Sequence, residues 1–350
     1  VGLDWAAFNN RLTGSFDWYV RTTKDMIGPA PILGSVLGTD APKTNNCDMR
    51  STGWELELGW RDQIAQVKYG VKLNLSDATS KILRYPYEGK FENQNINGYY
   101  NGKQLNEIWG YESVGLAQSN EEMAEWLKGN KPNWGSNWGE GDVMYKNLVD
   151  RVDENGNKID EGVVNAGSNT LGDHGDKKVI GNSTPRYNFG ITLNAEWKGF
   201  DFSIFFQGVM KRDWMFGAGQ PYFWGATGNV WQSTVFKEHL DYWSKDNKGA
   251  YYPKPYVEGG ITKNQEPQTR YLQNAAYMRC KNIQLGYSLP TSLISRAGLS
   301  NCRIYFSCDN LFTITKLSSV FDPEGLGGGW GSGKLYPLQR TFAFGVNVSF

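Results

Sequence analysis

Nine segments of this chain alternate between apolar and polar residues. In the last of them, 341–350, one parity holds three phenylalanines and two valines, and the other holds small or polar residues. Because successive side chains of a strand point to opposite faces, the alternation predicts β-strands with one apolar face and one polar face. The predicted strands are 1–8, 12–20, 54–61, 67–76, 187–197, 200–207, 277–289, 302–309 and 340–350.

The connections between these strands alternate in length. Short ones are expected at 9–12, 61–66, 197–201 and 289–301, and long ones at 27–50, 82–184, 210–274 and 313–336. A regular alternation of short and long connections places every long loop at the same end of the sheet. Outer-membrane barrels have this arrangement, with tight periplasmic turns and long extracellular loops, and 82–184 and 210–274 would be the two longest.

The composition favours a membrane barrel over its main alternative, a surface glycan-binding β-sandwich without transport. Aromatic residues make up 14% of the chain although its mean hydropathy is negative, as expected of strands that are apolar on one face only. The strands are long, their apolar faces end in aromatic residues, and no apolar run is long enough for a membrane helix. The polar face carries charged and amide side chains that a water-filled lumen tolerates: Glu55, Glu57, Lys68, Lys72, Asp201 and Gln207.

Several longer motifs resemble the C-terminal half of the SusC/RagA-type TonB-dependent transporters of Bacteroidetes. They are STPRYNFGITLNAEWKGFDFSIFFQGVMKRD (183–213), YMRCKNIQLGYSLP (277–290), DNLFTITKLSSVFDPE (309–324) and YPLQRTFAFGVNVSF (336–350). The resemblance implies an all-β transmembrane antiparallel barrel of roughly 22 strands with a plugged lumen, of which residues 1–350 would form the last nine strands. The chain starts directly in a strand without an initiator Met, so we expect the plug, the TonB-binding segment and the earlier strands to lie outside it.

The same resemblance implies a function and a location. It implies outer-membrane import of an oligosaccharide or, less often, a peptide, energised through TonB and assisted by a SusD-like surface lipoprotein. A siderophore is a further alternative within the same class of barrel. The expected location is the bacterial outer membrane, in contact with its lipid. Lys+Arg and Asp+Glu are equal at 36 each, so no net charge favours nucleic acid as a partner.

One acidic segment is a candidate calcium site. The family usually carries an unbroken acidic loop after the stretch matched here by GDVMYKNL (141–148), whereas this chain reads DRVDENGNKIDEG (150–162). Asp153, Asn155, Asn157 and Asp160 could supply oxygen ligands to a structural Ca²⁺. Lys158 stands where such a loop needs glycine, and the twelfth position is Val164 rather than an acid, so a solvated turn is the favoured interpretation.

The long loops are rich in aromatic residues, which suit stacking on sugar rings and also suit packing against a partner protein. The predicted ligand-binding residues are Trp134, Trp138, Trp214, Phe216, Tyr222, Trp224 and Trp231.

The sequence contains no pattern for catalysis, and we expect no enzymatic activity and no organic cofactor. The DHGD segment (173–176) is expected to be a hydrogen-bonded loop. The four cysteines, Cys47, Cys280, Cys302 and Cys308, lack metal-ligand spacing and are expected to be free thiols. The less favoured alternative is that Cys280 approaches Cys308 across a hairpin.

Overall fold

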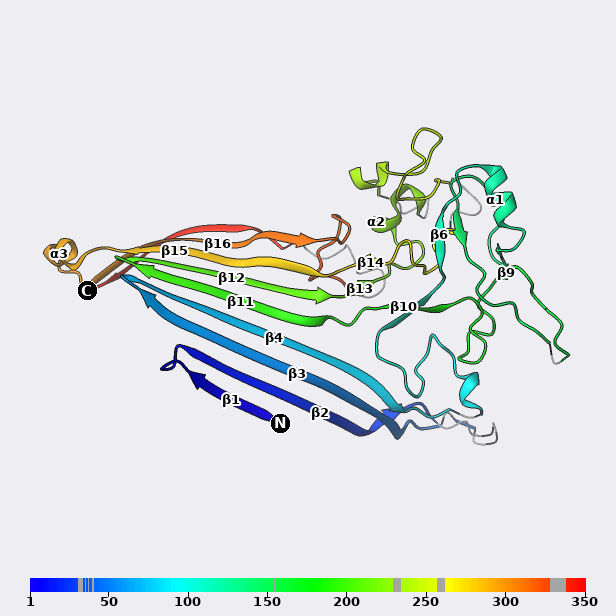
Figure 1. Cartoon of the computed structure of the whole chain (residues 1–350), viewed down its shortest axis with the longest axis horizontal. Helices are drawn as coiled ribbons and strands as arrows, with labels where there is room; N and C mark the ends of the chain where they lie inside the picture. Colours follow the sequence, from blue (N-terminus) through cyan, green and yellow to red (C-terminus); the bar gives the residue numbers. More distant parts are fainter. Residues whose placement is uncertain are drawn as a thin grey trace.

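The structure is a long antiparallel sheet with a folded group of loops at one end (Figure 1). It is a computed structural model, and it describes residues 1–30, 34, 36, 38–39, 41–87, 89–153, 155–228, 234–256, 262–327 and 338–350. The main sheet has nine strands in the order β1-β2-β3-β4-β11-β12-β15-β16-β17, so each strand pairs with its neighbours along the chain. This confirms the nine predicted strands and the all-antiparallel sheet. The nine strands are β1 Gly2–Ala7, β2 Leu12–Gly28, β3 Thr44–Ile64, β4 Val67–Arg84, β11 Arg186–Trp197, β12 Phe200–Lys211, β15 Tyr277–Ser288, β16 Asn301–Thr315 and β17 Thr341–Ser349.

Five strands, β2, β3, β4, β12 and β16, are longer than the sequence pattern predicted. β2, β3 and β4 have 17, 21 and 18 residues, because their pairing continues past the apolar stretch into polar sequence. The alternation of apolar residues stops there, so the pattern could not reveal these extensions. A bulge at Asp25, whose φ is 54°, shifts the register of β2 against β3 within the extension.

The short connections lie at one end of the sheet and the long ones at the other, as predicted (Figure 1). We refer to these as the turn end and the loop end. Among the described residues, no helix is both long enough and apolar enough to span a membrane. The helices are α1 Asn120–Trp126, α2 Pro221–Trp224 and α3 Thr291–Ile294, with 3₁₀ helices at Phe91–Asn93, Gly225–Thr227, Lys237–Leu240 and Ser295–Ala297.

The remaining short strands pair within the loops at the loop end. Three pairs are antiparallel, and β7 with β9 is parallel. These strands are β5 Glu107–Gly110 with β10 Lys178–Asn182, β6 Ser113–Leu116 with β8 Val143–Tyr145, β7 Lys131–Pro132 with β9 Val163–Val164, and β13 Asp213–Trp214 with β14 Gln273–Asn274.

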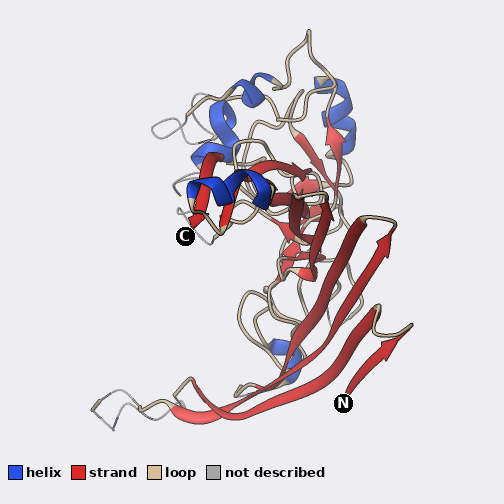
Figure 2. Cartoon of the chain, turned by 90° about the vertical axis from the view of Figure 1, so that its left-hand side faces the viewer, coloured by secondary structure: helices blue, strands red, loops and turns tan. Residues whose placement is uncertain are grey.

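The main sheet has an apolar face and a polar face. On the apolar face of β17, Phe344 is 83% exposed and Val346 is 60% exposed, and no second large sheet of the described residues packs against them. Viewed from the turn end, the sheet follows a curved path (Figure 2). The β-sandwich alternative is therefore wrong, since a sandwich buries such a face against a second sheet.

Aromatic rings collect on the apolar face near the turn end. The ring of Phe8 meets Trp60 edge-on at 6.1 Å, and Phe200 contacts both Trp197 and Tyr287. Rings at this level are typical of the aromatic girdles where a barrel meets the membrane–water boundary.

Glycine on the polar face makes room for large side chains from the next strand. Gly345 is paired with Tyr305, and a Cβ at position 345 would lie 2.3 Å from the Tyr305 ring. The tyrosine ring therefore lies flat along the wall instead of projecting away from it. All four cysteines are free thiols, as predicted.

Candidate functional site

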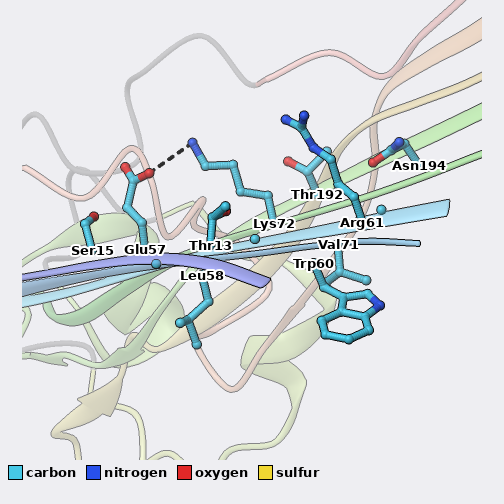
Figure 3. A pocket seen from close by; sticks show the side chains of 13 residues that line it. Thr13, Ser15, Glu57, Leu58, Trp60, Arg61, Val71, Lys72, Thr192 and Asn194 are labelled. Carbon is cyan, nitrogen blue, oxygen red and sulfur yellow. Dashed lines mark ion pairs between the residues drawn. The ribbon is translucent and has the colours of Figure 1, made fainter. Parts of the chain in front are cut away.

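The polar face of β2, β3, β4 and β11 is hollowed near the turn end. The hollow has a volume of about 450 Å³. Figure 3 shows its polar side chains on one side of the strands, with Leu58, Trp60 and Val71 directed to the other. The alternation predicted from sequence therefore separates the two faces at this site. The polar lining side chains are Thr13, Ser15, Glu57, Arg61, Lys72, Thr192 and Asn194.

Charges on the polar face are paired across strands. Lys72 on β4 lies 3.1 Å from Glu57 on β3, and both side chains are more than half exposed. Further along the sheet, Arg303 donates to Asp201 at 2.9 Å and lies over the ring of Tyr305. A wall of paired charges, hydroxyls and amides suits the passage of a hydrated, polar solute, because it offers hydrogen bonds without a strong net field.

The described loop residues at the loop end fold together into one unit, which we call the loop module (residues 85–87, 89–153, 155–185, 212–228, 234–256, 262–276 and 316–327). Its core contains residues from all three connections, such as Tyr145, Trp243 and Phe321. Phe216 illustrates the packing, since its ring lies 4.6 Å from Phe223 and 4.2 Å from Phe321. The long connections are thus a second folded layer above the sheet.

A buried ion pair links two of the loops. Lys263 is 1% exposed, Asp142 is 0% exposed, and their charged atoms lie 2.7 Å apart. The ammonium also donates to the carbonyl oxygen of Asn137 at 2.8 Å and lies 4.3 Å from the centre of the Tyr256 ring. Asn264 completes the link by donating to Asp142 and accepting from the backbone N–H of Val143.

Two of the predicted ligand-binding residues are packing residues in this structure. Trp224 is 0% exposed and Phe216 is 2% exposed, both inside the loop core. A ring without an exposed face cannot stack on a sugar in this arrangement. The indole N–H of Trp224 donates to the carbonyl oxygen of Gly217, which fixes the ring further. Trp231 lies outside the described residues.

The other four predicted rings are partly buried at the edge of that core: Trp134, Trp138, Trp214 and Tyr222. Trp134 stacks on Tyr111 at 4.8 Å and meets Trp138 edge-on at 6.5 Å. Tyr222 contacts the ring of Phe236 at 6.2 Å. These rings keep part of their surface open, and ligand contact remains a prediction for them.

The predicted calcium residues are occupied by hydrogen bonds from their own loop. Asp153 accepts from the backbone N–H groups of Asn155 and Asn157 and from the side-chain amide of Asn157. Asp160 accepts from the Arg151 guanidinium at 2.6 Å. No group of three or more His, Cys, Asp or Glu residues in the described part of the chain could hold a metal ion. Donors of the protein itself therefore engage the Asp153 and Asp160 carboxylates, and calcium binding here stays a prediction.

Hydrogen bonding also determines the titration of this loop. The hydrogen bonds from Asn157 lower the pKa of Asp153. Burial acts to raise the pKa of Asp160, but hydrogen bonds from Arg151 and Asn165, together with the positive charge of Arg151, outweigh it and the net pKa is lowered. At Asp150, the backbone N–H of Gly162, the Asn147 amide and Lys158 lower the pKa to about 2.

We expect chelation with EDTA to leave protease nicking between residues 150 and 180 unchanged, because this chain already satisfies both carboxylates. An Asp153→Ala/Asp160→Ala variant should be nicked faster with or without EDTA, since lost hydrogen bonds of this kind cost about 1–3 kcal/mol where the donors are shielded from water. Limited proteolysis followed by mass spectrometry measures the nicking rate with and without EDTA in both proteins. Faster nicking of the unmodified protein in EDTA would restore the calcium assignment.

The DHGD segment is a hydrogen-bonded loop, as predicted. Asp176 is fully buried and accepts from the backbone N–H groups of Leu148, Val149 and Asn165. His174 packs against Trp109 with the ring centres 5.5 Å apart. The other histidine, His239, is buried in the loop module, and burial lowers its pKa.

Sequence reasoning missed the polar residues that join the loops. Lys263 and Asn264 belong to no quoted motif, and Asp142 lies in GDVMYKNL (141–148), which gave no sign of a buried charge. The hydrogen bonds that join the two loops connect residues 118 to 122 positions apart along the chain. Gln268, which is fully buried and donates to Tyr145, was missed for the same reason. No local signal marks such residues, since each resembles an ordinary solvated loop residue.

Comparison with known proteins gives a consistent result over the whole chain. No family model matches. The chain is 27% identical to TonB-dependent receptor P3 of Formosa agariphila and 24% identical to TonB-dependent receptor SusC of Bacteroides thetaiotaomicron, in both cases over 100% of its length. A solved structure of the RagAB peptide transporter matches with a TM-score of 0.69 and 27% identity, again over 100% of this chain.

The chain covers 33%, 31% and 34% of these three proteins, so it spans about a third of their length. Its long antiparallel sheet, apolar on one face and polar on the other, matches the barrel wall of such receptors, and the polar face is the lumen side. Over its whole length the chain is similar to the SusC/RagA-type TonB-dependent receptors, and its sheet is part of an outer-membrane barrel wall.

Proposed function

We propose that this chain forms part of an importer that carries an oligosaccharide across the outer membrane, driven through TonB. The observation that carries the proposal is the polar, charge-paired face of the sheet beneath a folded loop module with part-exposed aromatic rings. The loop module would capture the solute and the polar wall would line its path inward. Movement would be driven from a TonB-contacting segment outside this chain.

A SusD-like surface lipoprotein is the proposed partner at the loop end. Three apolar side chains of the loop module are exposed: Val149, Val152 and Ile159. Val152 and Ile159 flank one hairpin, in which the Ile159 N–H donates to the carbonyl oxygen of Arg151. Exposed apolar groups that lie together and are rimmed by polar residues are typical of protein–protein contacts, which supports a lid at this position.

A peptide is the second candidate substrate. The solved structure named above is described as a peptide transporter, and the chain is as similar to it as to receptor P3. Part-exposed tryptophan and tyrosine rings suit sugar faces and peptide side chains alike.

The test is binding by the complete receptor that contains this chain. We expect it to retain members of a panel of neutral oligosaccharides and to release them when Trp138 or Tyr222 is changed to alanine. Each substitution should weaken binding about fivefold, since one aromatic contact contributes about 1 kcal/mol. Isothermal titration calorimetry measures the change. Tyr99→Ala is the matched control, because Tyr99 is exposed but lies outside the loop core.

The possible outcomes separate the hypotheses. Retention of a pooled peptide digest in place of oligosaccharides would overturn the oligosaccharide assignment and keep import. Unchanged ligand binding with loss of the co-purifying lipoprotein would mean that the two rings pack against the lid. Equal weakening by Tyr99→Ala would contradict a role specific to Trp138 and Tyr222.

A further inference from the structure

Two positive charges face each other on the apolar side of the wall, at the loop end of β3 and β4. Arg50 and Lys81 are directly paired across these strands. Both side chains are exposed. Arg50 has the parity of Trp54, so it projects from the outward face rather than into the lumen. Like charges directly opposite each other on one face of a sheet repel and destabilise the pair.

Neither charge has an acidic partner among the described residues. Among the described residues, the Arg50 guanidinium makes one long hydrogen bond, of 3.4 Å, to the hydroxyl of Thr22. The neighbouring Arg84 is different, because it lies 2.8 Å from Asp48 and 2.7 Å from Asp25. The fold thus neutralises one cation at this level and leaves two others side by side.

The pair lies at the height of the outer-leaflet headgroups. Trp60 marks the aromatic girdle at the turn end of β3, and Arg50 follows about ten residues toward the loop end. Ten residues extend about 34 Å along a strand, or about 26 Å across a membrane at the usual tilt. This distance matches the height of the apolar band of an outer-membrane barrel, about 25 Å, so Arg50 lies at the outer edge of the hydrocarbon layer.

We propose that Arg50 and Lys81 bind the phosphate of a lipid headgroup in the outer leaflet. The planar guanidinium can donate two parallel hydrogen bonds to phosphate oxygens, and the ammonium can supply the second charge. The phosphate would replace the repulsion between the two cations with attraction to both. This lipid site is independent of the transported solute, since it lies on the opposite face of the wall from the lumen.

The experiment measures lipid retention by the complete receptor in detergent, using native mass spectrometry. The probes are dioleoyl phosphatidic acid, dioleoylglycerol, which lacks only the phosphate, and inorganic phosphate. An Arg50→Gln/Lys81→Gln variant should retain at least tenfold less phosphatidic acid, because both cations that attract the phosphate are removed. The control is Lys68→Gln, which removes an exposed lysine from the lumen face of β4, the strand that carries Lys81. This variant should retain as much phosphatidic acid as the unmodified receptor.

The single variants Arg50→Gln and Lys81→Gln should each show an intermediate loss, and heat-modifiable migration should show that all variants form barrels. Equal retention of phosphatidic acid by the double variant would overturn the site. Equal retention of dioleoylglycerol would also overturn it, by showing that the acyl chains alone bind. Binding of inorganic phosphate as strong as that of the lipid would reduce the site to a free-anion site and overturn the lipid assignment.

Discussion

Replacing Leu73 with arginine should destabilise the assembled barrel by about 1–3 kcal/mol, because the cost of a cation at the lipid face is about 2–4 kcal/mol at the membrane midplane and falls toward the aromatic girdle. Leu73 is on β4, paired with Leu58 on β3 and Ile191 on β11, so apolar side chains surround it on the outward face. The measurement is the fraction of heat-modifiable barrel in isolated outer membranes, together with urea unfolding in lipid vesicles.

Asn74→Arg is the matched control for this prediction. Asn74 is the next residue on the same strand but projects into the lumen, directly opposite Glu57. An arginine there gains a neighbouring carboxylate and remains in water, so assembly should be near normal. Equal defects at positions 73 and 74 would contradict the assignment of the two faces.

Changing Lys263 to methionine should destabilise the loop module by about 3–5 kcal/mol while leaving the barrel strands intact. The substitution leaves the Asp142 carboxylate, which is 0% exposed, without its cation. Breaking a buried pair by removing one partner is costly, because the remaining charge keeps its desolvation penalty. Hydrogen exchange should increase in both loops that the pair joins, at 131–145 and at 262–268.

Lys245→Met is the control for that variant. Lys245 is in the same connection, its side chain is 79% exposed, and its ammonium lies 3.9 Å from Glu140. The Lys245→Met substitution therefore removes a lysine without leaving a buried charge unpaired. Hydrogen exchange in the two loops should not change. If Lys263→Met behaved like Lys245→Met, the buried pair would not be what holds the loops together.

The sheet could be predicted closely because its information is local. Each strand has its own alternation, since lipid on one side and water on the other sort the side chains of every strand independently of its neighbours. The short turns at Ala65–Gln66 and Lys198–Gly199 were evident as brief interruptions between two alternating segments. The extensions of β2, β3, β4, β12 and β16 were missed. In β2, β3 and β4 the reason is that above the apolar band both faces are polar and the alternation disappears.

The loops could not be predicted in the same way, because their stability depends on residues that are far apart in the chain. Trp134, Trp138, Trp214 and Tyr222 look the same in sequence as Trp224, yet the first four lie at the edge of the loop core and Trp224 lies inside it. Burial depends on which connection folds over which, and no single connection contains that information.

The sequence alone therefore determined the strands, their two faces and the end at which the long loops emerge, since each follows from a repeating contact with lipid or water. Only the tertiary structure decided which aromatic rings stay open, that Asp160 pairs with Arg151, and that Lys263 meets Asp142. The pairing of Arg50 with Lys81 on the outward face was decided there too, because cross-strand register brings together residues that the chain keeps apart.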